Sequence, residues 1–172
     1  DDERAQTTEG DTTTSVEANP YELPLEERPP LFDPCTEIPE EALEEAGFTP
    51  EDKDQNFFID DHAMINGCQW TNDDLMLSVA SYWYSLEEMV ANNDFQLQEP
   101  FPDQDRSGQF FKDPNRRDGA ELAIFSTTRG VVIIDGQFAS ILPTFRGEPT
   151  TDLKAAFITT SIPLVNALPE DF

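Results

Sequence analysis

The stretch ELAIFSTTRGVVIID, residues 121–135, decides the fold class of this chain. Residues 121–126 and 129–135 are predicted to be two strands joined by a short turn at Thr127-Thr128. Helical patterns lie towards both ends of the chain and extended segments lie between them. That order is typical of an α+β domain, so we expect an antiparallel β-sheet packed against helices.

Three helices are expected around these strands. The first begins at Pro39, placed at the first helical position, and stops at Gly47. The second is opened by the capping box Ser85-Leu86-Glu87-Glu88 and continues to about Asn92. The last is capped by Thr150 or Thr151 and kinked by Pro163. Apolar and small side chains follow its 3.6-residue period at Leu153, Phe157, Thr160, Leu164 and Leu168.

Extended segments precede and follow the central hairpin. We expect strands over residues 56–59, 63–70 and 75–83, all N-terminal to it. Residues 138–145 are predicted to form a further strand that Pro143 weakens. The proline- and aspartate-rich residues 94–119 are expected to be a loop.

The first 30 residues are predicted to be a tether that precedes one folded domain of residues 31–172. They are acidic and threonine-rich and contain too few large apolar groups to offset the entropy of ordering. YELPLEERPP, residues 21–30, adds three prolines and predicts a stiff, extended segment near polyproline II. We expect this tail to gain order only against another chain, with Tyr21, Leu23 and Leu25 as its apolar contacts.

The net charge of the chain limits its partners. It carries 36 acidic and 10 basic side chains, a formal charge of −26. This field repels nucleic acid, because binding to phosphates depends on Lys and Arg, and it repels anionic lipid headgroups. It favours basic protein surfaces and cations, and it also confers solubility. Solubility alone is therefore an alternative to recognition of a basic partner.

The start of the chain suggests processing. No run of about 18 apolar residues is present, so the sequence predicts no bilayer-spanning helix. The chain begins at Asp1-Asp2 without an initiator Met or a hydrophobic signal region. We therefore expect a mature or trimmed product.

The two cysteines, Cys35 and Cys68, favour a disulfide over a metal site. With His62 they provide three nitrogen or sulfur ligands, whereas a closed zinc site needs four. Two unrelated buried thiols remain the alternative, since free cysteine is among the most buried residue types. A disulfide would stabilise the chain by roughly 3–4 kcal/mol through loop entropy and would indicate an oxidising compartment.

No catalytic signature is present. His62 is the only histidine and lies beside Asp60 and Asp61, which is typical of an acidic surface loop. The sequence has no G-x-S-x-G nucleophile elbow and no phosphate-binding glycine loop. Carboxylates are so numerous that no pair stands out as an acid and base couple. We therefore expect no catalytic residue, no cofactor and no enzymatic activity.

One segment has part of a calcium-binding pattern. DQDRSG, residues 103–108, places oxygen ligands at positions 1, 3 and 5 and Gly108 at position 6. The glutamate required at position 12 is Pro114. We therefore expect a polar surface turn rather than a metal site, with calcium binding at millimolar affinity as the alternative.

These motifs together resemble a known family. The chain is similar to uncharacterised actinobacterial envelope lipoproteins with a D-P-C … C-x-W signature, matched here by Asp33-Pro34-Cys35 and Cys68-Gln69-Trp70. The resemblance implies a Cys35–Cys68 disulfide and an α+β fold similar to the Mog1/PsbP type. It also implies a lipidated cysteine directly before Asp1, and it implies no enzymatic activity.

Two functions compete. The first is an accessory subunit, lipid-anchored on the outer face of the cytoplasmic membrane and bound to a larger membrane protein complex or another envelope protein. Respiratory-chain assemblies are the candidate complex. The alternative is a free-standing binding module for a lipid or other small ligand. An apolar cavity near Trp70, Trp83 and Phe125 would favour the alternative.

Overall fold

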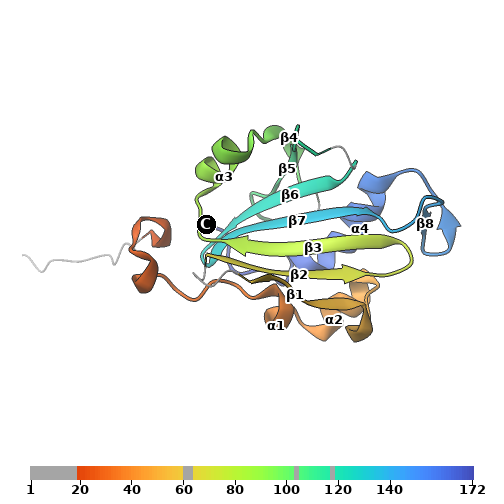
Figure 1. Cartoon of the computed structure of the whole chain (residues 1–172), viewed down its shortest axis with the longest axis horizontal. Helices are drawn as coiled ribbons and strands as arrows, with labels where there is room; N and C mark the ends of the chain where they lie inside the picture. Colours follow the sequence, from red (N-terminus) through yellow and green to blue (C-terminus); the bar gives the residue numbers. More distant parts are fainter. Residues whose placement is uncertain (1–18, 60–63, 103–104, 117–118) are drawn as a thin grey trace, which may run out of the picture.

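The architecture is an antiparallel sheet with helices on its faces. A computed structural model describes residues 19–59, 64–102, 105–116 and 119–172. Its seven-stranded sheet has the order β1-β2-β3-β7-β6-β5-β4, and every neighbouring pair of strands is antiparallel. Figure 1 shows the sheet with the helices arranged around it. The α+β prediction is therefore confirmed.

Most of the strands lie where the sequence predicts them. The sheet consists of β1 (Lys53–Ile59), β2 (Ile65–Thr71), β3 (Leu75–Tyr82), β4 (Gln96–Pro100), β5 (Gln109–Lys112), β6 (Glu121–Thr127) and β7 (Gly130–Phe138). The expected extended segments before the hairpin correspond to β1, β2 and β3. The hairpin predicted over residues 121–135 is formed by β6 and β7.

The β6–β7 turn is shifted by one residue from its predicted position. Thr127 pairs with Gly130, so the turn consists of Thr128 and Arg129 instead of Thr127-Thr128. Gly130 has φ +117°, and a Cβ there would lie 2.6 Å from the Cδ1 atom of Leu31. Glycine is therefore required both by the backbone conformation and by the close approach of Leu31.

Alternating residues of the strands build two apolar clusters on opposite faces of the sheet. On one face Phe125, Val132 and Ile134 pack with α4 (Leu153–Val165), which contributes Phe157 and Leu164. The short helices α1 (Pro34–Glu37) and α2 (Glu40–Ala46) complete this cluster. The intervening residues face the other side, where α3 (Leu86–Asn93) places Met89 against Ile124 and Ile133.

Two proline-containing segments differ from their predictions. The expected loop over residues 94–119 contains β4 and β5, and Pro100 is tolerated because β4 is the edge strand. The strand predicted over residues 138–145 is wrong. Phe138 ends β7, the chain bends, and β8 (Thr144–Phe145) pairs with β9 (Glu148–Pro149) in a separate hairpin.

The helix boundaries differ slightly from their predictions. Asp152, rather than Thr150 or Thr151, caps α4, and its side chain accepts a hydrogen bond from the Ala155 amide. Pro39 is the residue before α2 instead of its first helical residue. Ser85 caps α3 as predicted, accepting from the Glu88 amide at 3.1 Å. The predicted kink at Pro163 stays a prediction, and Pro163 lies inside α4.

The described part of the N-terminal tail packs against the domain. Residues 19–30 are not extended throughout, because two single-turn 3-10 helices form over Pro20–Glu22 and Leu25–Glu27. Pro20 is buried, and the segment lies at one end of the long axis of the molecule (Figure 1). The prediction of a continuous polyproline II segment over residues 21–30 is therefore wrong. Residues 1–18 lie outside the described part of the chain.

Candidate interaction site

The predicted cysteine pair forms a disulfide. Cys35 in α1 is bonded to Cys68 in β2, with their Cα atoms 5.2 Å apart. Cys68 is completely buried in the larger apolar cluster, so the bond ties the short helix α1 directly to the core. Both cysteines of the chain are used, and the prediction of a disulfide is confirmed.

Tyr21 lies in an aromatic group formed by distant parts of the chain. Its ring lies 5.5 Å from that of Trp83 and 5.2 Å from that of Phe172, measured between centroids. Its hydroxyl donates a 2.8 Å hydrogen bond to the carbonyl oxygen of Thr127. Burial raises the pKa of Tyr21 to about 12, although its hydrogen bonds and the nearby Arg28 act in the opposite direction.

Arg28 fixes the same segment through backbone oxygens. Its guanidinium donates to the carbonyls of Leu23, Tyr21 and Trp83 and lies 5.5 Å from the centroid of the Trp83 ring. Leu23 is half-buried, whereas Leu25 is 37% exposed. The three predicted contact residues of the tail are therefore in different environments. Their contact with another chain stays a prediction.

The aromatic residues named for a ligand cavity are packed into the core. Trp70, Trp83 and Phe125 are all buried, and Trp70 and Phe125 belong to the larger apolar cluster. The registers place Trp70 opposite Leu77 and Phe125 opposite Val132, towards different ends of the sheet. Among the described residues, none of these three side chains lines the cavity beside Leu142, the cavity beside Arg116 and Leu122, or the cavity beside Arg106 and Val165.

The structure describes only part of the predicted acidic loop and of the calcium-like pattern. His62 lies outside the described residues, as do Asp103 and Gln104 at the start of the calcium-like pattern. Ser107 of that pattern bonds to the Asp171 carboxylate. A Cβ on Gly108 would lie 2.1 Å from the Phe125 ring. Gly108 is therefore explained by packing, and within the described residues no group of His, Cys, Asp or Glu could hold a metal ion.

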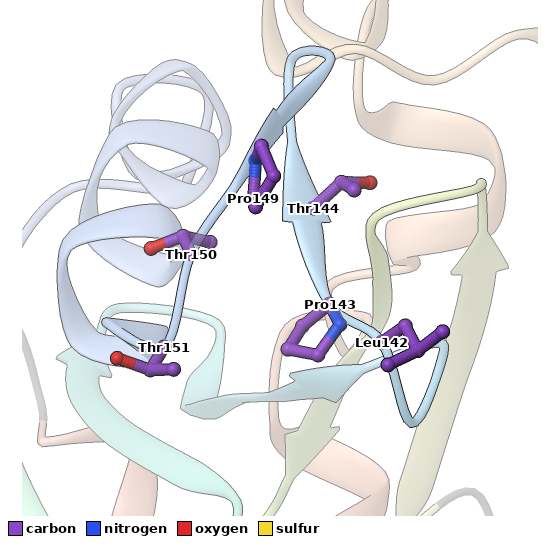
Figure 2. A pocket seen from close by; sticks show the side chains of 6 residues that line it. All are labelled: Leu142, Pro143, Thr144, Pro149, Thr150 and Thr151. Atoms are coloured by element: carbon purple, nitrogen blue, oxygen red, sulfur yellow. The ribbon is translucent and has the colours of Figure 1, made fainter.

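The candidate site is a loop that the sequence did not indicate. Ile141 and Leu142, between β7 and β8, are 97% and 80% exposed, unlike the other large apolar side chains around them. Beside them lies a cavity of about 530 Å³ lined by Leu142, Pro143, Thr144, Pro149, Thr150 and Thr151. Figure 2 shows these side chains on the two facing segments that enclose the cavity. None of the described residues that line it is charged.

Asp74 holds this loop in place. Its carboxylate accepts hydrogen bonds from the Thr144 hydroxyl and the Arg146 amide, each at 3.1 Å, and its carbonyl accepts from Ala139. Across the cavity the Thr150 amide donates to the Pro143 carbonyl at 3.1 Å. The exposed apolar residues therefore lie on a hydrogen-bonded scaffold that begins at the β2–β3 turn.

Two acidic residues flank one wall of the cavity in the sequence. Glu148 and Asp152 lie directly before and after its Pro149–Thr151 wall, and both are exposed. Further along α4, Lys154 forms an ion pair with Glu99. Glu121 lies close enough to Lys154, Glu99 and Asp152 for their charges to act on its carboxyl. Burial raises the pKa of its carboxyl, Lys154 lowers it, and Glu99 and Asp152 raise it further.

The site could have been suspected from one signal. Pro143 interrupts a predicted strand directly after Ile141 and Leu142. These two apolar residues therefore lie next to a strand break and have no assigned partner. Both residues fall inside the strand predicted over residues 138–145. The loop is exposed because β7 has already ended at Phe138.

Comparison with protein families assigns the chain to a family. The model of the DUF3558 family, described as a protein of unknown function, matches residues 1–152. The chain belongs to this family. The match includes the disulfide, the docked segment 19–30 and all six residues around the cavity, and it ends at Asp152, the residue that caps α4.

Searches of curated proteins and of solved structures found no match to this DUF3558 chain. The similarity to the Mog1/PsbP fold and to actinobacterial envelope lipoproteins therefore stays a prediction. In the residues that the structure describes, no helix is long and apolar enough to cross a membrane.

Proposed function

We propose that this DUF3558 chain is a non-catalytic interaction protein of the cell envelope, acting as an accessory subunit of a larger membrane protein complex. The observation that carries the proposal is the exposure of Ile141 and Leu142 on a chain of net charge −26. Exposing adjacent apolar side chains to water is unfavourable, and covering them with another surface would lower the free energy. Apolar side chains at the centre of an interface and polar ones at its rim are typical of protein partners.

The disulfide supports an extracytoplasmic location. Structural disulfides persist in oxidising compartments and are rare in the cytosol. We place the protein on the outer face of the cytoplasmic membrane, held by a lipid on a cysteine before Asp1. Respiratory-chain assemblies are our candidate complex.

A small-ligand binding module is the second candidate function. The cavity beside Leu142, at about 530 Å³, falls in the size range of small-molecule sites. Its two walls come from neighbouring segments of one hairpin, and the described residues that line it offer no charged group to orient a ligand. These features favour a side chain of a partner over a free small molecule.

A pull-down from native membranes in mild detergent tests the proposal. The full chain, an Ile141→Asp/Leu142→Asp variant and a Leu97→Asp control are each used as bait. Leu97 is 64% exposed on the edge strand β4, so the control places one of the two added charges on an exposed leucine outside the loop. We expect one membrane protein complex to be recovered with the wild type and the control and lost with the double variant. Equal recovery with all three baits contradicts the proposed site.

A further inference from the structure

We propose that the cavity beside Leu142 accepts an apolar side chain from a partner segment that carries Lys or Arg next to it. This inference rests on the proposed function and adds the chemistry of the partner. The occupant is an apolar–basic segment of another protein.

The cavity walls offer few backbone amides for hydrogen bonds to a partner. Pro143 and Pro149 have no amide hydrogen, and the Thr150 amide already donates to the Pro143 carbonyl. A segment that docks here therefore gains little from pairing with the backbone, unlike a peptide added to a sheet edge. Its binding depends on burying apolar atoms against Leu142 and the two prolines.

The charges around the cavity select the residues next to that apolar group. Glu148 and Asp152 flank one wall, and the only nearby lysine on α4, Lys154, is already paired with Glu99. Arg146, between β8 and β9, lies with its guanidinium 5.2 Å from the Phe145 ring centroid. A cation beside the docked side chain would meet the two carboxylates, whereas an acidic neighbour would be repelled.

The same charges argue against the other occupants. A second copy of the chain would bring another net charge of −26 towards this surface. An anionic bilayer would also be repelled. The loop and the docked tail also lie at opposite ends of β3. Asp74 precedes β3 and Trp83 follows it, so loop and docked tail are separated by roughly 30 Å at about 3.3 Å per residue. Figure 1 shows residues 19–30 and β8 at opposite ends of the molecule.

Short synthetic peptides test the preference on the isotope-labelled full chain. One peptide has a central Leu-Ile flanked by lysines, the second replaces the lysines with glutamates, and the third keeps the lysines and replaces Leu-Ile with serines. We expect the lysine–apolar peptide to shift the amide signals of residues 141–151 and to bind at least about tenfold more tightly than the other two. Equal binding of the three peptides, or no binding, overturns the inference.

Matched variants assign the two parts of the effect. Leu142→Asp should abolish binding, and Leu97→Asp should leave it unchanged. Glu148→Gln with Asp152→Asn should remove most of the preference for lysine, and asparagine keeps the cap of α4. A control with Glu87→Gln and Glu88→Gln removes two exposed acids of α3 and should retain the preference. If both pairs of substitutions reduce the preference equally, general acidity and not this site causes it.

Two further measurements cover the other occupants. Self-association in sedimentation that Leu142→Asp removes would show that a second copy covers the loop. Binding of the chain, without a lipid anchor, to zwitterionic vesicles would show a bilayer contact. Either result overturns the inference. If the membrane pull-down depends on Ile141 and Leu142 but the peptides show no charge preference, the proposed function stands and this inference fails.

Discussion

The hydroxyl of Tyr21 donates a 2.8 Å hydrogen bond to the carbonyl oxygen of Thr127, which lies 106 residues further along the chain. This contact joins the start of the described chain to the end of β6. Phe172 packs on the same tyrosine ring, so the two ends of the described chain meet at one point.

We expect substitution of Tyr21 to release the tail. Tyr21→Phe removes one hydrogen bond, worth about 0.5–1.5 kcal/mol, and Tyr21→Ala also removes two aromatic contacts of about 0.5–1.5 kcal/mol each. Amide exchange over residues 19–30 should be protected in the wild type, faster in Tyr21→Phe and fastest in Tyr21→Ala. Leu25→Ala, which changes an exposed side chain, is the control. Unprotected exchange in the wild type would restore the expectation that this segment orders only against a partner.

The same contact should weaken in alkali. Burial raises the pKa of Tyr21 to about 12 from 10.0. Because the folded pKa is above the unfolded one, the protonated hydroxyl contributes its full stabilisation below about pH 10 and loses it as the pH rises through about 12. The free energy of unfolding should therefore fall more over this range in the wild type than in Tyr21→Phe. Burial also raises the pKa of Tyr82, but this group is present in both proteins and cancels in the difference. Identical pH profiles would show that Tyr21 is not docked.

The disulfide should provide a large share of the stability. Replacing Cys35 and Cys68 together with alanine should cost roughly 3–4 kcal/mol through loop entropy, in addition to the loss of packing around Cys68. Denaturant titration of the wild type with and without reductant, compared with the double variant, measures this. The variant should not respond to reductant. Two alkylatable thiols in the native, unreduced protein would contradict the bond itself.

The sequence predicts those parts of the molecule that local signals specify. Gly47 ends α2 in the left-handed conformation, with φ +97°, as a glycine after an acidic helix indicates. Strand β3 is buried on both faces at several positions, which its mixed apolar pattern indicates. The Cys35–Cys68 pairing followed from the family resemblance, because the sequence alone left free thiols open.

The parts that could not be predicted depend on contacts between distant residues. Strand β4 has five exposed residues and carries no apolar pattern, so its pairing with β5 is set by the sheet edge available to it. The β8–β9 hairpin depends on Asp74, about 70 residues earlier in the chain. The tail docks through one tyrosine and one arginine that bind backbone oxygens, and backbone oxygens have no signature in a sequence.

Asp74 offers a test of the loop that leaves its apolar residues intact. Asp74→Ala removes the acceptors of the Thr144 hydroxyl and the Arg146 amide, at about 1 kcal/mol each. Amide exchange over residues 139–151 should accelerate, and recovery of the membrane partner should fall although Ile141 and Leu142 are unchanged. The neighbouring Asp73 is exposed, so Asp73→Ala is a control with the same charge change. If both variants behave alike, Asp74 acts through charge and not through the loop.

Association with the recovered partner should be steered by charge. The chain carries −26, and exposed carboxylates act over a Debye length of about 8 Å at physiological salt. If the partner surface is basic, the association rate should fall as salt rises, whereas the dissociation rate should change less. Replacing Glu148 with glutamine and Asp152 with asparagine should slow association without changing dissociation, whereas replacing Glu22, Glu26 and Glu27 at the opposite end of the molecule should change the association rate little. Leu142→Ala should instead speed dissociation, because it removes buried apolar contact. An association rate that does not depend on salt would leave the acidity as a solubility device and assign recognition to the apolar loop alone.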